Sequence, residues 1–406
     1  MKINFPYTRE LKQIANTLLD KGDELRLVGG CVRNFLMEKP ITDFDLACKY
    51  VPERTMEILK KAGIKTIPTG IEHGTITALI NGIHFEITTL RKDIAPDGRH
   101  SKIEFTDDYL EDAKRRDFTI NAIYLDFRGN VYDYFDGLKD IKTGIIRFIG
   151  NADDRIKEDY LRILRFFRFF CYYGFVLDET GLESCIKHKD GINKLSSERI
   201  KMEMFKILKA TYPVKTLQIM QDNGILQQIT DGMEFDFTKL ALFCSIKQKL
   251  NFKESGVFNL ALLLKQRKEF AEDLEYLKNK WKLSNQEYKE LVFLLHNNIK
   301  ECFESEVKEL LFKFKNKDWI IKLFLLDCTL NRDIKRKSIE YLDKIIKFIK
   351  NYEIPELSIT GRDLIQMGFK EGRELGETLK KAENIFIESD FKLNKNEIVL
   401  KLSKNK

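Results

Sequence analysis

The chain has 406 residues, of which 43% are hydrophobic and 33% are charged, with 70 lysines and arginines against 63 aspartates and glutamates. It has no run of about 18 uncharged apolar residues and no CxxC pair among its seven cysteines, which argues against a membrane span, a disulfide framework and a zinc site. We expect a globular, helix-rich protein of more than one domain, whose small positive excess permits RNA as a partner without requiring it.

The first third of the chain alternates short β-like runs with helical stretches. Its N-terminus, "MKINFPYTRELKQ", lacks the apolar core of a signal peptide, so we expect a cytoplasmic protein. Residues 51–63 predict a helix that stops at Gly63, and the Asn81-Gly82 pair between two alternating runs predicts a β-hairpin. Residues 91–108 contain few apolar side chains and a Pro-Asp-Gly turn, which predicts a mobile loop.

Gly29 and Gly30 end the strand-like run "ELRLVGG" and open a short helix, "CVRNFL". A turn of this kind brings backbone N–H groups to a helix N-terminus, where they can bind phosphate, and Arg33 adds a cation one turn later. Most such glycine pairs are only tight turns. The phosphate interpretation gains weight from an acidic pair that follows shortly afterwards.

That acidic pair is Asp43 and Asp45, which flank Phe44 in the strand-like segment "ITDFDLA". Alternate side chains of a strand share a face, so both carboxylates lie together while Phe44 and Leu46 point to the other side. Two like charges this close repel each other unless a cation lies between them, which predicts a site for two divalent ions. Glu86, on the polar face of a later strand, is a candidate third ligand. The alternative is an exposed polar strand face.

The segment "LEDAKRRDFTINAIYLD" places Arg115, Arg116 and Asp117 immediately before an apolar run. Consecutive arginines point in different directions on any regular element, so one can reach phosphate while the other pairs with an acid. Asp117 either caps the following turn or accepts a hydrogen bond from a ribose 2′-hydroxyl. Asn121, one helical turn further on, is a candidate for the same task.

From about residue 151 onward, apolar positions recur at three and four residues, which predicts helices throughout the remaining chain. The segment "DRIKEDYLRILRFFRFF" predicts a helix with an apolar set facing the core and a basic set beside it: Leu161, Leu164 and Phe167, and Arg162, Arg165 and Arg168. Asp159 lies one turn before Arg162. The two form either an internal ion pair or a reader of a nucleotide base, because Asp accepts from an exocyclic amino group while Arg donates to a ring nitrogen or carbonyl of cytosine or adenine.

Four motifs in order, "LVGGCVRN…DFDLA", "RRDFTINA", "EDYLRILRFFRF" and "LSSERIKMEM", resemble the tRNA nucleotidyltransferase (CCA-adding enzyme) and poly(A) polymerase family in its eubacterial and eukaryotic class, class II. This class belongs to the polymerase-beta-like nucleotidyltransferase superfamily. The resemblance is strong over roughly the first 210 residues, and "LSITGRDLIQMG" near 357–368 is similar to the family's C-terminal tail.

The resemblance implies an α+β fold class, with a small mixed-sheet nucleotidyltransferase head followed by an all-α neck, body and tail. Combined with the changes of pattern along the chain, it predicts four domains: 1–150 for the catalytic head, 151–213 for the neck that recognises the base, 214–354 for the body, and 355–406 for the tail that contacts tRNA. The reaction that it implies is addition of C, C and A to the 3′ end of tRNA, from CTP and ATP, with Mg²⁺ and without a nucleic-acid template.

Roles carry over to matching motif positions. Asp43 and Asp45 become the catalytic metal ligands, and the expected nucleotide-binding residues are Gly30, Arg33, Arg116, Asp159, Arg162, Arg165 and Arg168. Asp159 and Arg162 are the base-reading pair among them, while "SER" at 197–199 is expected to support the neck. One departure from the family's pattern is Asn34, where Asp is common after the "GGxVR" arginine, so an ion pair of that residue with Arg33 is in doubt.

Several activities share these head motifs. The segment 92–106 resembles the flexible loop kept by enzymes that add the terminal A, which argues against CC-only addition, and the chain lacks the basic extensions usual in poly(A) polymerases. Complete CCA addition is therefore favoured, with A-only addition and poly(A) synthesis as alternatives. A rival of another class is a non-catalytic RNA-binding protein that retains the fold, and the intact acidic pair of Asp43 and Asp45 argues against it.

Overall fold

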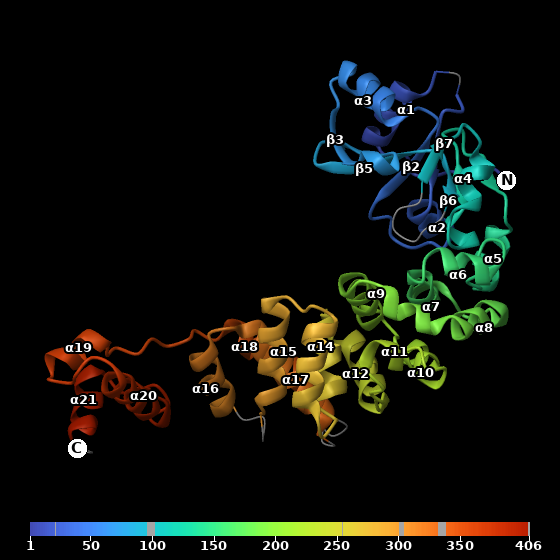
Figure 1. Cartoon of the computed structure of the whole chain (residues 1–406). Coiled ribbons are helices and arrows are strands. Elements are labelled where there is room, and N and C mark those ends of the chain that lie inside the picture. The colour runs from blue at the N-terminus through green and yellow to red at the C-terminus, as the bar shows by residue number, and fades with distance from the viewer. Residues whose placement is uncertain (21, 96–101, 254, 300–303, 332–337, 405–406) are drawn as a thin grey trace. The chain divides into compact units, whose positions relative to one another are not determined.

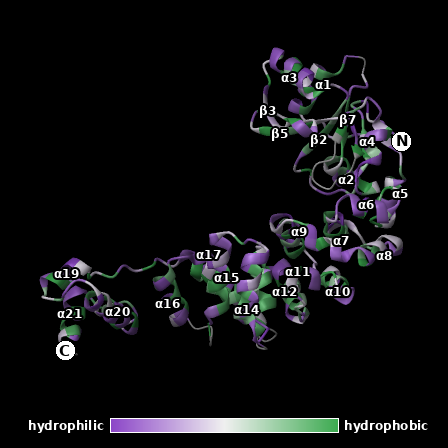
Figure 2. Ribbon diagram, viewed as in Figure 1, coloured by the Kyte–Doolittle hydropathy of each residue, from purple (hydrophilic) through white to green (hydrophobic). Residues whose placement is uncertain are grey.

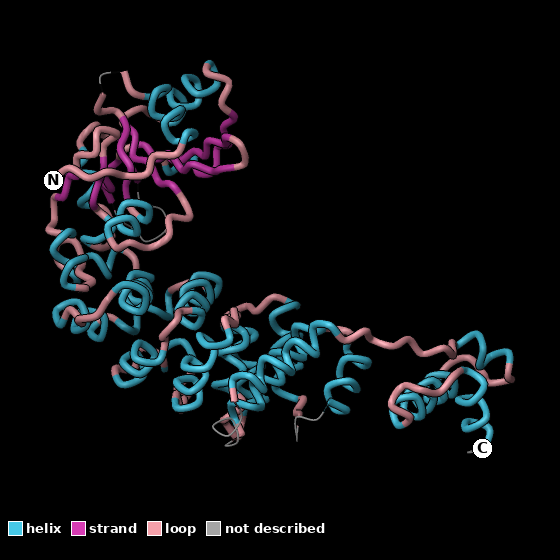
Figure 3. Tube along the Cα trace, turned by 180° about the vertical axis from the view of Figure 1, so that it is seen from behind, coloured by secondary structure: helices cyan, strands magenta, loops and turns pink. Residues whose placement is uncertain are grey.

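The computed structural model describes every residue except 21, 96–101, 254, 300–303, 332–337 and 405–406 (Figure 1). The chain forms two compact units: a first unit of residues 1–234 with 280–282, and a second unit of residues 235–279 with 283–406. The finer division at 150, 213 and 355 stays a prediction. The fold is α+β, and the strands are confined to the beginning of the chain (Figure 3).

A seven-stranded mixed sheet organises the start of the first unit. Its spatial order is β3 (Lys65–Gly70), β4 (Thr75–Ile80), β5 (Ile83–Thr89), β2 (Phe44–Cys48), β1 (Leu25–Val28), β8 (Ile123–Leu125) and β9 (Val131–Asp133). Neighbouring strands are antiparallel except β2 and β5, which run parallel. The hairpin predicted at Asn81-Gly82 is confirmed, because β4 and β5 pair from Ile80 and Ile83 outward.

Helices cover both faces of this sheet, and alternation along the strands decides which face each side chain meets. The helices are α1 (Arg9–Leu18), α2 (Gly30–Leu36), α3 (Pro52–Lys61), α4 (Tyr109–Lys114) and α5 (Gly137–Thr143), with short 3-10 turns at η1 (Ile71–His73) and η2 (Thr119–Asn121). Leu46 joins the core beneath α1, α2 and α3, whereas Ala47 joins the core against α4. Phe44 packs on the Leu46 side and stacks on Phe85, so Asp45 lies on the α4 face. The prediction that Phe44 and Leu46 point to one face of the sheet and Asp45 to the other is confirmed.

The prediction of a mobile loop over 91–108 is wrong at both ends of that range. Strands β6 (Arg91–Ala95) and β7 (Lys102–Phe105) form a separate antiparallel pair, and Asp108 caps α4. Polar side chains suit a two-stranded ribbon that has no apolar core, which explains why composition alone suggested a loop. The predicted Pro-Asp-Gly turn at 96–98 lies outside the described residues. The predicted helix at 51–63 is confirmed as α3, followed by Gly63 with φ of +74°.

The rest of the first unit is helical. Its elements are α6 (Ala152–Glu158), α7 (Leu161–Tyr173), α8 (Glu179–Lys187), η3 (Lys189–Lys194), α9 (Ser197–Lys209), α10 (Val214–Asp222) and α11 (Gln227–Thr230). The single helix predicted over 154–170 is wrong, because the chain breaks at Asp159, whose backbone is extended with φ of −155° and ψ of 106°. The predicted core positions Leu161, Leu164 and Phe167 are buried as expected.

The described residues of the second unit form helices and the segments that connect them. It contains α12 (Thr238–Leu250), α13 (Gly256–Leu264), α14 (Phe270–Lys280), α15 (Asn285–His296), α16 (Glu304–Phe314), α17 (Lys317–Leu330), α18 (Ile339–Asn351), α19 (Gly361–Gln366), α20 (Arg373–Glu388) and α21 (Lys395–Lys404). Helix α13 is apolar except for Asn259, and every residue of it is buried. Figure 2 shows hydrophobic segments, in green, in the region of α14 and α15. A smaller cluster, which includes Leu364, Phe386 and Ile398, holds α19, α20 and α21 together. Within the described ranges, every helix is too short or too polar to cross a bilayer.

Candidate nucleotidyl-transfer site

The turn between β1 and α2 brings backbone against the carboxylate of Asp45. Gly29 has φ of +71°, and a Cβ atom there would lie 3.3 Å from Oδ2 of Asp45 and 3.8 Å from Nη1 of Arg116. The same carboxylate oxygen lies against Gly30, where a Cβ atom would be 3.7 Å from it. Glycine is required here both for the left-handed backbone and for this close approach. The predicted strand-to-helix turn and the acidic pair therefore meet in space.

Three carboxylates gather at this edge of the sheet. Asp45 and Glu86 are direct partners in the parallel register of β2 and β5, and Asp43 precedes β2 by one residue. Burial raises the pKa of Asp45, with Asp43 adding to the rise and Arg116 opposing it. The pKa of Glu86 is also raised, by burial first and then by Asp45 and Asp43. Mutual repulsion of this kind makes the site favourable for a cation.

The carboxylates at this site suit a hard divalent cation whose remaining ligands are waters and substrate phosphates. Asp43 is exposed and accepts a hydrogen bond from the hydroxyl of Thr42 at 2.9 Å. No three His, Cys, Asp or Glu side chains converge as a ready-made metal cage anywhere in the described part of the chain. Mg²⁺ is commonly held by one or two carboxylates together with waters and substrate phosphates, so two aspartates are sufficient protein ligands.

Arg116 is fixed beside Asp45 by Asp112, a residue that sequence reasoning did not select. Asp112 is 1% exposed, and its Oδ2 accepts from Nη2 of Arg116 at 3.0 Å and from the hydroxyl of Tyr124 at 2.7 Å. Its Oδ1 accepts from Nε of Arg115 at 2.9 Å. The predicted pairing with an acid is found for both arginines, which share Asp112, whereas the predicted phosphate contact of one of them stays a prediction. The sequence did carry a signal for this contact, because Asp112 precedes Arg115 by three residues and Arg116 by four, the spacings at which side chains meet on a helix.

A second chain of contacts joins α2 to α7. Arg33 donates from Nη1 to Oδ1 of Asn121 at 2.5 Å, and Asn121 donates from Nδ2 to Oδ1 of Asp117 at 2.9 Å. Asp117 in turn accepts from Nε of Arg165 at 2.8 Å and from the backbone N–H of Phe118 at 2.9 Å. Burial alone would raise the pKa of Asp117, but Arg165 holds it below its usual range. Four predicted residues therefore form one continuous network.

Asp159 and Arg162, the two residues predicted to read the base, have different side-chain partners in this structure, and their role in base reading stays a prediction. Asp159 accepts from Nη2 of Arg199 at 2.7 Å, whereas Arg162 donates to the backbone oxygen of Arg155 at 2.7 Å and pairs with Glu158. The internal Asp159–Arg162 ion pair, which was the alternative prediction, is absent. Asp159 precedes α7, and its Oδ1 accepts from the backbone N–H of Leu161 at 3.1 Å. The sequence analysis did not identify Glu158 as the partner of Arg162. The signal was its position four residues before Arg162, a spacing at which ion pairs form.

Arg168 lies at the far end of the basic set on α7 and pairs with the neighbouring helix α9. Its Nε donates to Oε2 of Glu203 at 2.5 Å, and the Glu203 side chain is fully buried. Arg199 and Glu203 are one turn apart on α9, so this helix presents a cation to Asp159 and an anion to Arg168. The expectation that the "SER" motif at 197–199 supports the neck is consistent with the Arg199 contact.

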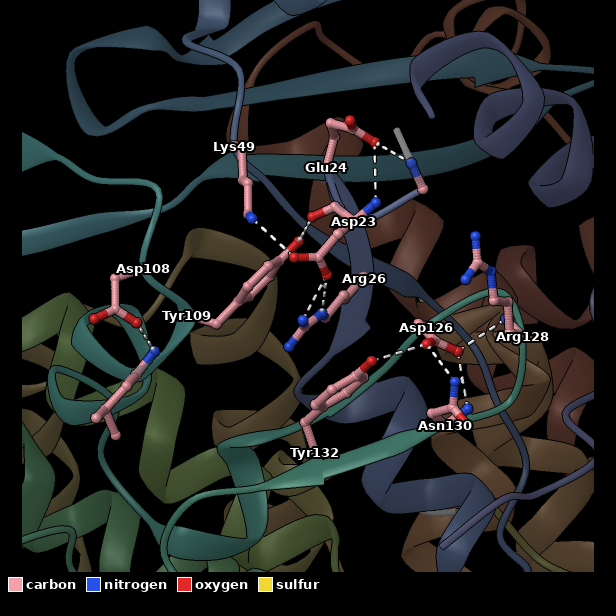
Figure 4. Close-up of polar contacts among 12 residues, drawn as sticks. Asp23, Glu24, Arg26, Lys49, Asp108, Tyr109, Asp126, Arg128, Asn130 and Tyr132 are labelled. Atoms are coloured by element: carbon pink, nitrogen blue, oxygen red, sulfur yellow. Dashed lines mark hydrogen bonds and ion pairs between the residues drawn. The ribbon is translucent and has the colours of Figure 1, made fainter. Parts of the chain in front are cut away.

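A polar cluster around Arg26 lies on the same sheet face as Asp45, at the other end of the strands (Figure 4). The Arg26 guanidinium carbon lies 3.8 Å from the ring centre of Tyr109 and 3.6 Å from that of Tyr132. Asp23 accepts from Nε of Arg26 at 3.1 Å and from Nζ of Lys49 at 2.8 Å. Because Tyr109 begins α4, this cluster anchors the helix that carries Asp112.

Comparison with known proteins decides the family. Residues 25–147 match the model of the poly A polymerase head domain, and residues 174–235 match that of the probable RNA and SrmB-binding site of polymerase A. The mitochondrial CCA tRNA nucleotidyltransferase 1 of Homo sapiens is 32% identical over all of this chain and 93% of its own length. The chain belongs to the class II CCA-adding enzyme and poly(A) polymerase family. It is therefore a nucleotidyltransferase, of a family that generally uses a divalent metal ion.

Other members of the family agree with this assignment. The CCA-adding enzyme of Staphylococcus saprophyticus is 30% identical over 94% of this chain and 96% of its own length. The crystal structure of the Bacillus stearothermophilus CCA-adding enzyme in complex with CTP superposes with a TM-score of 0.82 at 25% identity, covering 99% of this chain and 98% of the other. Some family members are named as mitochondrial, so the cytoplasmic location stays a prediction.

Proposed function

We propose that this protein adds C, C and A to the 3′ end of tRNA, using CTP and ATP and no nucleic-acid template. The observation that carries the proposal is the meeting of the Gly29–Gly30 turn, the carboxylate of Asp45 and the guanidinium of Arg116 on one sheet face. Relatives that match all or 94% of this chain are named for CCA addition, which supports the proposal.

Asp43 and Asp45 would hold magnesium, with Glu86 as a neighbour in register and a candidate third ligand. Held by these two aspartates, the ion would supply activation of the 3′-hydroxyl and neutralisation of charge on the departing pyrophosphate. The backbone of Gly30 and the cations Arg33 and Arg116 bind the triphosphate, so that the bond from the 3′-oxygen to the α-phosphorus forms as pyrophosphate leaves. Asp117 and Asn121 are candidates to contact the ribose.

Base selection rests on Asp159 and Arg162, with Arg165 and Arg168 completing the pocket. Asp accepts from the amino group of cytosine or adenine, and Arg donates to the adjacent ring nitrogen or carbonyl. Guanine or uracil would leave buried polar groups unpaired, at a cost on the order of 1–3 kcal/mol for each group. Since both residues have protein partners in this structure, nucleotide binding exchanges the Arg162 contacts to Glu158 and the Arg155 carbonyl for contacts to the base.

The decisive experiment incubates the protein and magnesium with tRNA that lacks CCA, with CTP alone, ATP alone or both, and sizes the products. Complete CCA addition gives two added nucleotides with CTP, none with ATP, and three with both. A-only addition gives extension only on tRNA that already ends in CC, and long A tracts on unrelated RNA identify a poly(A) polymerase.

The variant Asp43→Ala separates an enzyme from a non-catalytic RNA-binding protein. We expect incorporation to fall at least about a thousandfold, because the variant loses a metal ligand, while tRNA affinity stays unchanged. Asp107, an exposed acid of the same sheet-bearing region, provides a control in Asp107→Ala, which should retain full activity. A wild-type protein that binds tRNA but incorporates nothing would contradict the proposed function.

A further inference from the structure

Two cations from α2 and the segment after it converge on one aromatic ring of α7. The Cζ atom of Arg33 lies 4.2 Å from the ring centre of Tyr173, and Nζ of Lys39 lies 4.4 Å from the same centre. Arg33 also donates from Nη2 to the Tyr173 hydroxyl at 2.9 Å, and Lys39 donates to the backbone oxygen of Tyr172 at 2.5 Å. The contacts of both cations are to neutral groups.

These cations repel each other, and no carboxylate compensates them at ion-pair distance within the described residues. Arg33 is 7% exposed, and its Nε is buried without a hydrogen-bond partner. Burial lowers the pKa of Arg33, and burial together with Arg33 lowers the pKa of Lys39. The buried guanidinium of Arg33 has an N–H donor without a partner and lies next to a second cation, Lys39. Such a pair of cations is suited to bind an anion.

The segment that carries Lys39 also leads into the metal-binding pair. It runs from the end of α2 to β2, so Lys39 precedes Asp43 by four residues. Asn34 fixes this segment from both sides, accepting from Nη2 of Arg33 at 3.0 Å and donating from Nδ2 to the backbone oxygen of Pro40 at 3.0 Å. The backbone N–H of Lys39 donates to the Asn34 carbonyl at 2.8 Å.

We propose that Lys39 acts with Arg33 to bind the β- and γ-phosphates of the incoming nucleotide and the pyrophosphate that leaves. The inference rests on the proposed function and deepens it, because it adds a binding residue to the same site. The ligand class is an inorganic or nucleotide polyphosphate. Lysine suits this task as a mobile point charge that follows the phosphate as it departs, whereas Arg33 is held in place by Asn121 and Tyr173.

The test measures binding of inorganic pyrophosphate, with magnesium chloride and without tRNA, by isothermal titration calorimetry on the full chain. Lys39→Met keeps the aliphatic stem on the Tyr173 ring and removes the charge. We expect affinities for pyrophosphate, CTP and ATP each to fall about tenfold, the effect of losing one charge-assisted hydrogen bond. Lys39→Arg should restore most of the affinity, and tRNA affinity should not change.

Lys215→Met is the matched control. Lys215 also donates to a backbone oxygen, that of Phe175 at 3.4 Å, and lies over an aromatic ring, that of Phe170 at 5.3 Å, yet Arg33 is not among its contacts. Its pyrophosphate affinity should equal that of the wild type. If Lys39→Met does not fold, as judged by its thermal midpoint, Lys39→Gln replaces it.

Unchanged pyrophosphate affinity in a folded Lys39 variant would overturn the inference. So would a loss of tRNA affinity without a loss of pyrophosphate affinity, which would assign Lys39 to the RNA backbone instead. Failure of the proposed function is a different result, since it requires the wild-type protein itself to incorporate no nucleotide into tRNA.

Discussion

Individual carboxylates in the head are distinguished by the cations around them. Asp112 and Asp117 each contact arginine and have a lowered pKa, whereas burial, with Asp43 adding to it, raises the pKa of Asp45 against the opposing charge of Arg116. The first two are therefore satisfied structural partners. A further cation next to Asp45 would stabilise its ionised form, which is the property expected of a metal ligand.

The two side-chain amide atoms of Asn34 have different tasks. An aspartate there would still accept from Arg33 but could not donate to the Pro40 carbonyl, and its charge would offset that of Arg33. We expect Asn34→Asp to weaken pyrophosphate binding about threefold to tenfold, because one positive charge is neutralised. Calorimetric titration measures this, and tighter binding by the variant would contradict it.

At the scale of elements, helices position the predicted site by ion pairs that are buried or half-buried. Helix α4 holds Arg116 through Asp112, and α9 holds Asp159 and Arg168 through Arg199 and Glu203. Breaking one partner of such a pair leaves an uncompensated buried charge, which costs more than an exposed pair contributes. The contacts of α4 also include the backbone N–H of Arg91, at the start of the β6–β7 ribbon, which donates to Asp112 at 3.4 Å.

The variant Asp112→Asn should destabilise the first unit by about 3 kcal/mol near neutral pH, since two arginines lose their common carboxylate. Burial alone would raise the pKa of Asp112, but Arg116 and Arg115 hold it below its usual range. A lowered folded-state pKa contributes stability that is present above the unfolded value, about 3.9, and is lost as pH falls through the lower folded value.

Thermal unfolding of both proteins between pH 3 and pH 7 measures this prediction. The difference in midpoint should be largest above about pH 4 and shrink toward pH 3, because Asp112 of the unfolded state takes up a proton in this range while Asp112 of the folded state stays ionised. Glu57→Gln is a control, because Glu57 pairs with Lys61 and Arg54 at an exposed position on α3. A difference that grows as the pH falls would contradict the assignment.

At the scale of the whole molecule, the chain leaves the first unit at residue 234 and returns to it for only three residues, 280–282. Trp281 is the largest fully buried side chain among the described residues. Its Nε1 donates to the backbone oxygen of Ile229 at 2.9 Å, and its ring lies 6.1 Å from that of Phe205. A distant segment of the chain thus completes the core beneath α9 and α11.

We expect Trp281→Ala to destabilise the first unit by about 3–5 kcal/mol, the usual cost of truncating a buried large aromatic. Hydrogen exchange should accelerate in α9 and α11, which lose contacts with the indole, and much less in the sheet. The control is Trp319→Ala, which truncates a half-buried tryptophan of α17 in the second unit and should leave exchange in α9 unchanged. Faster exchange confined to the second unit in Trp281→Ala would contradict the prediction.

The sequence by itself determined the motifs and the family. It also determined the helical character after residue 151 and the alternation that puts the side chains of Asp45 and Leu46 on opposite faces of the sheet. These properties are local, since side-chain period and turn chemistry depend on neighbours within a few residues. The structure decided what Asp159, Arg33 and Lys39 contact: Arg199 is 40 residues from Asp159, Tyr173 is 140 from Arg33, and Tyr172 is 133 from Lys39. Such pairs depend on how elements pack, and no spacing along the chain encodes them.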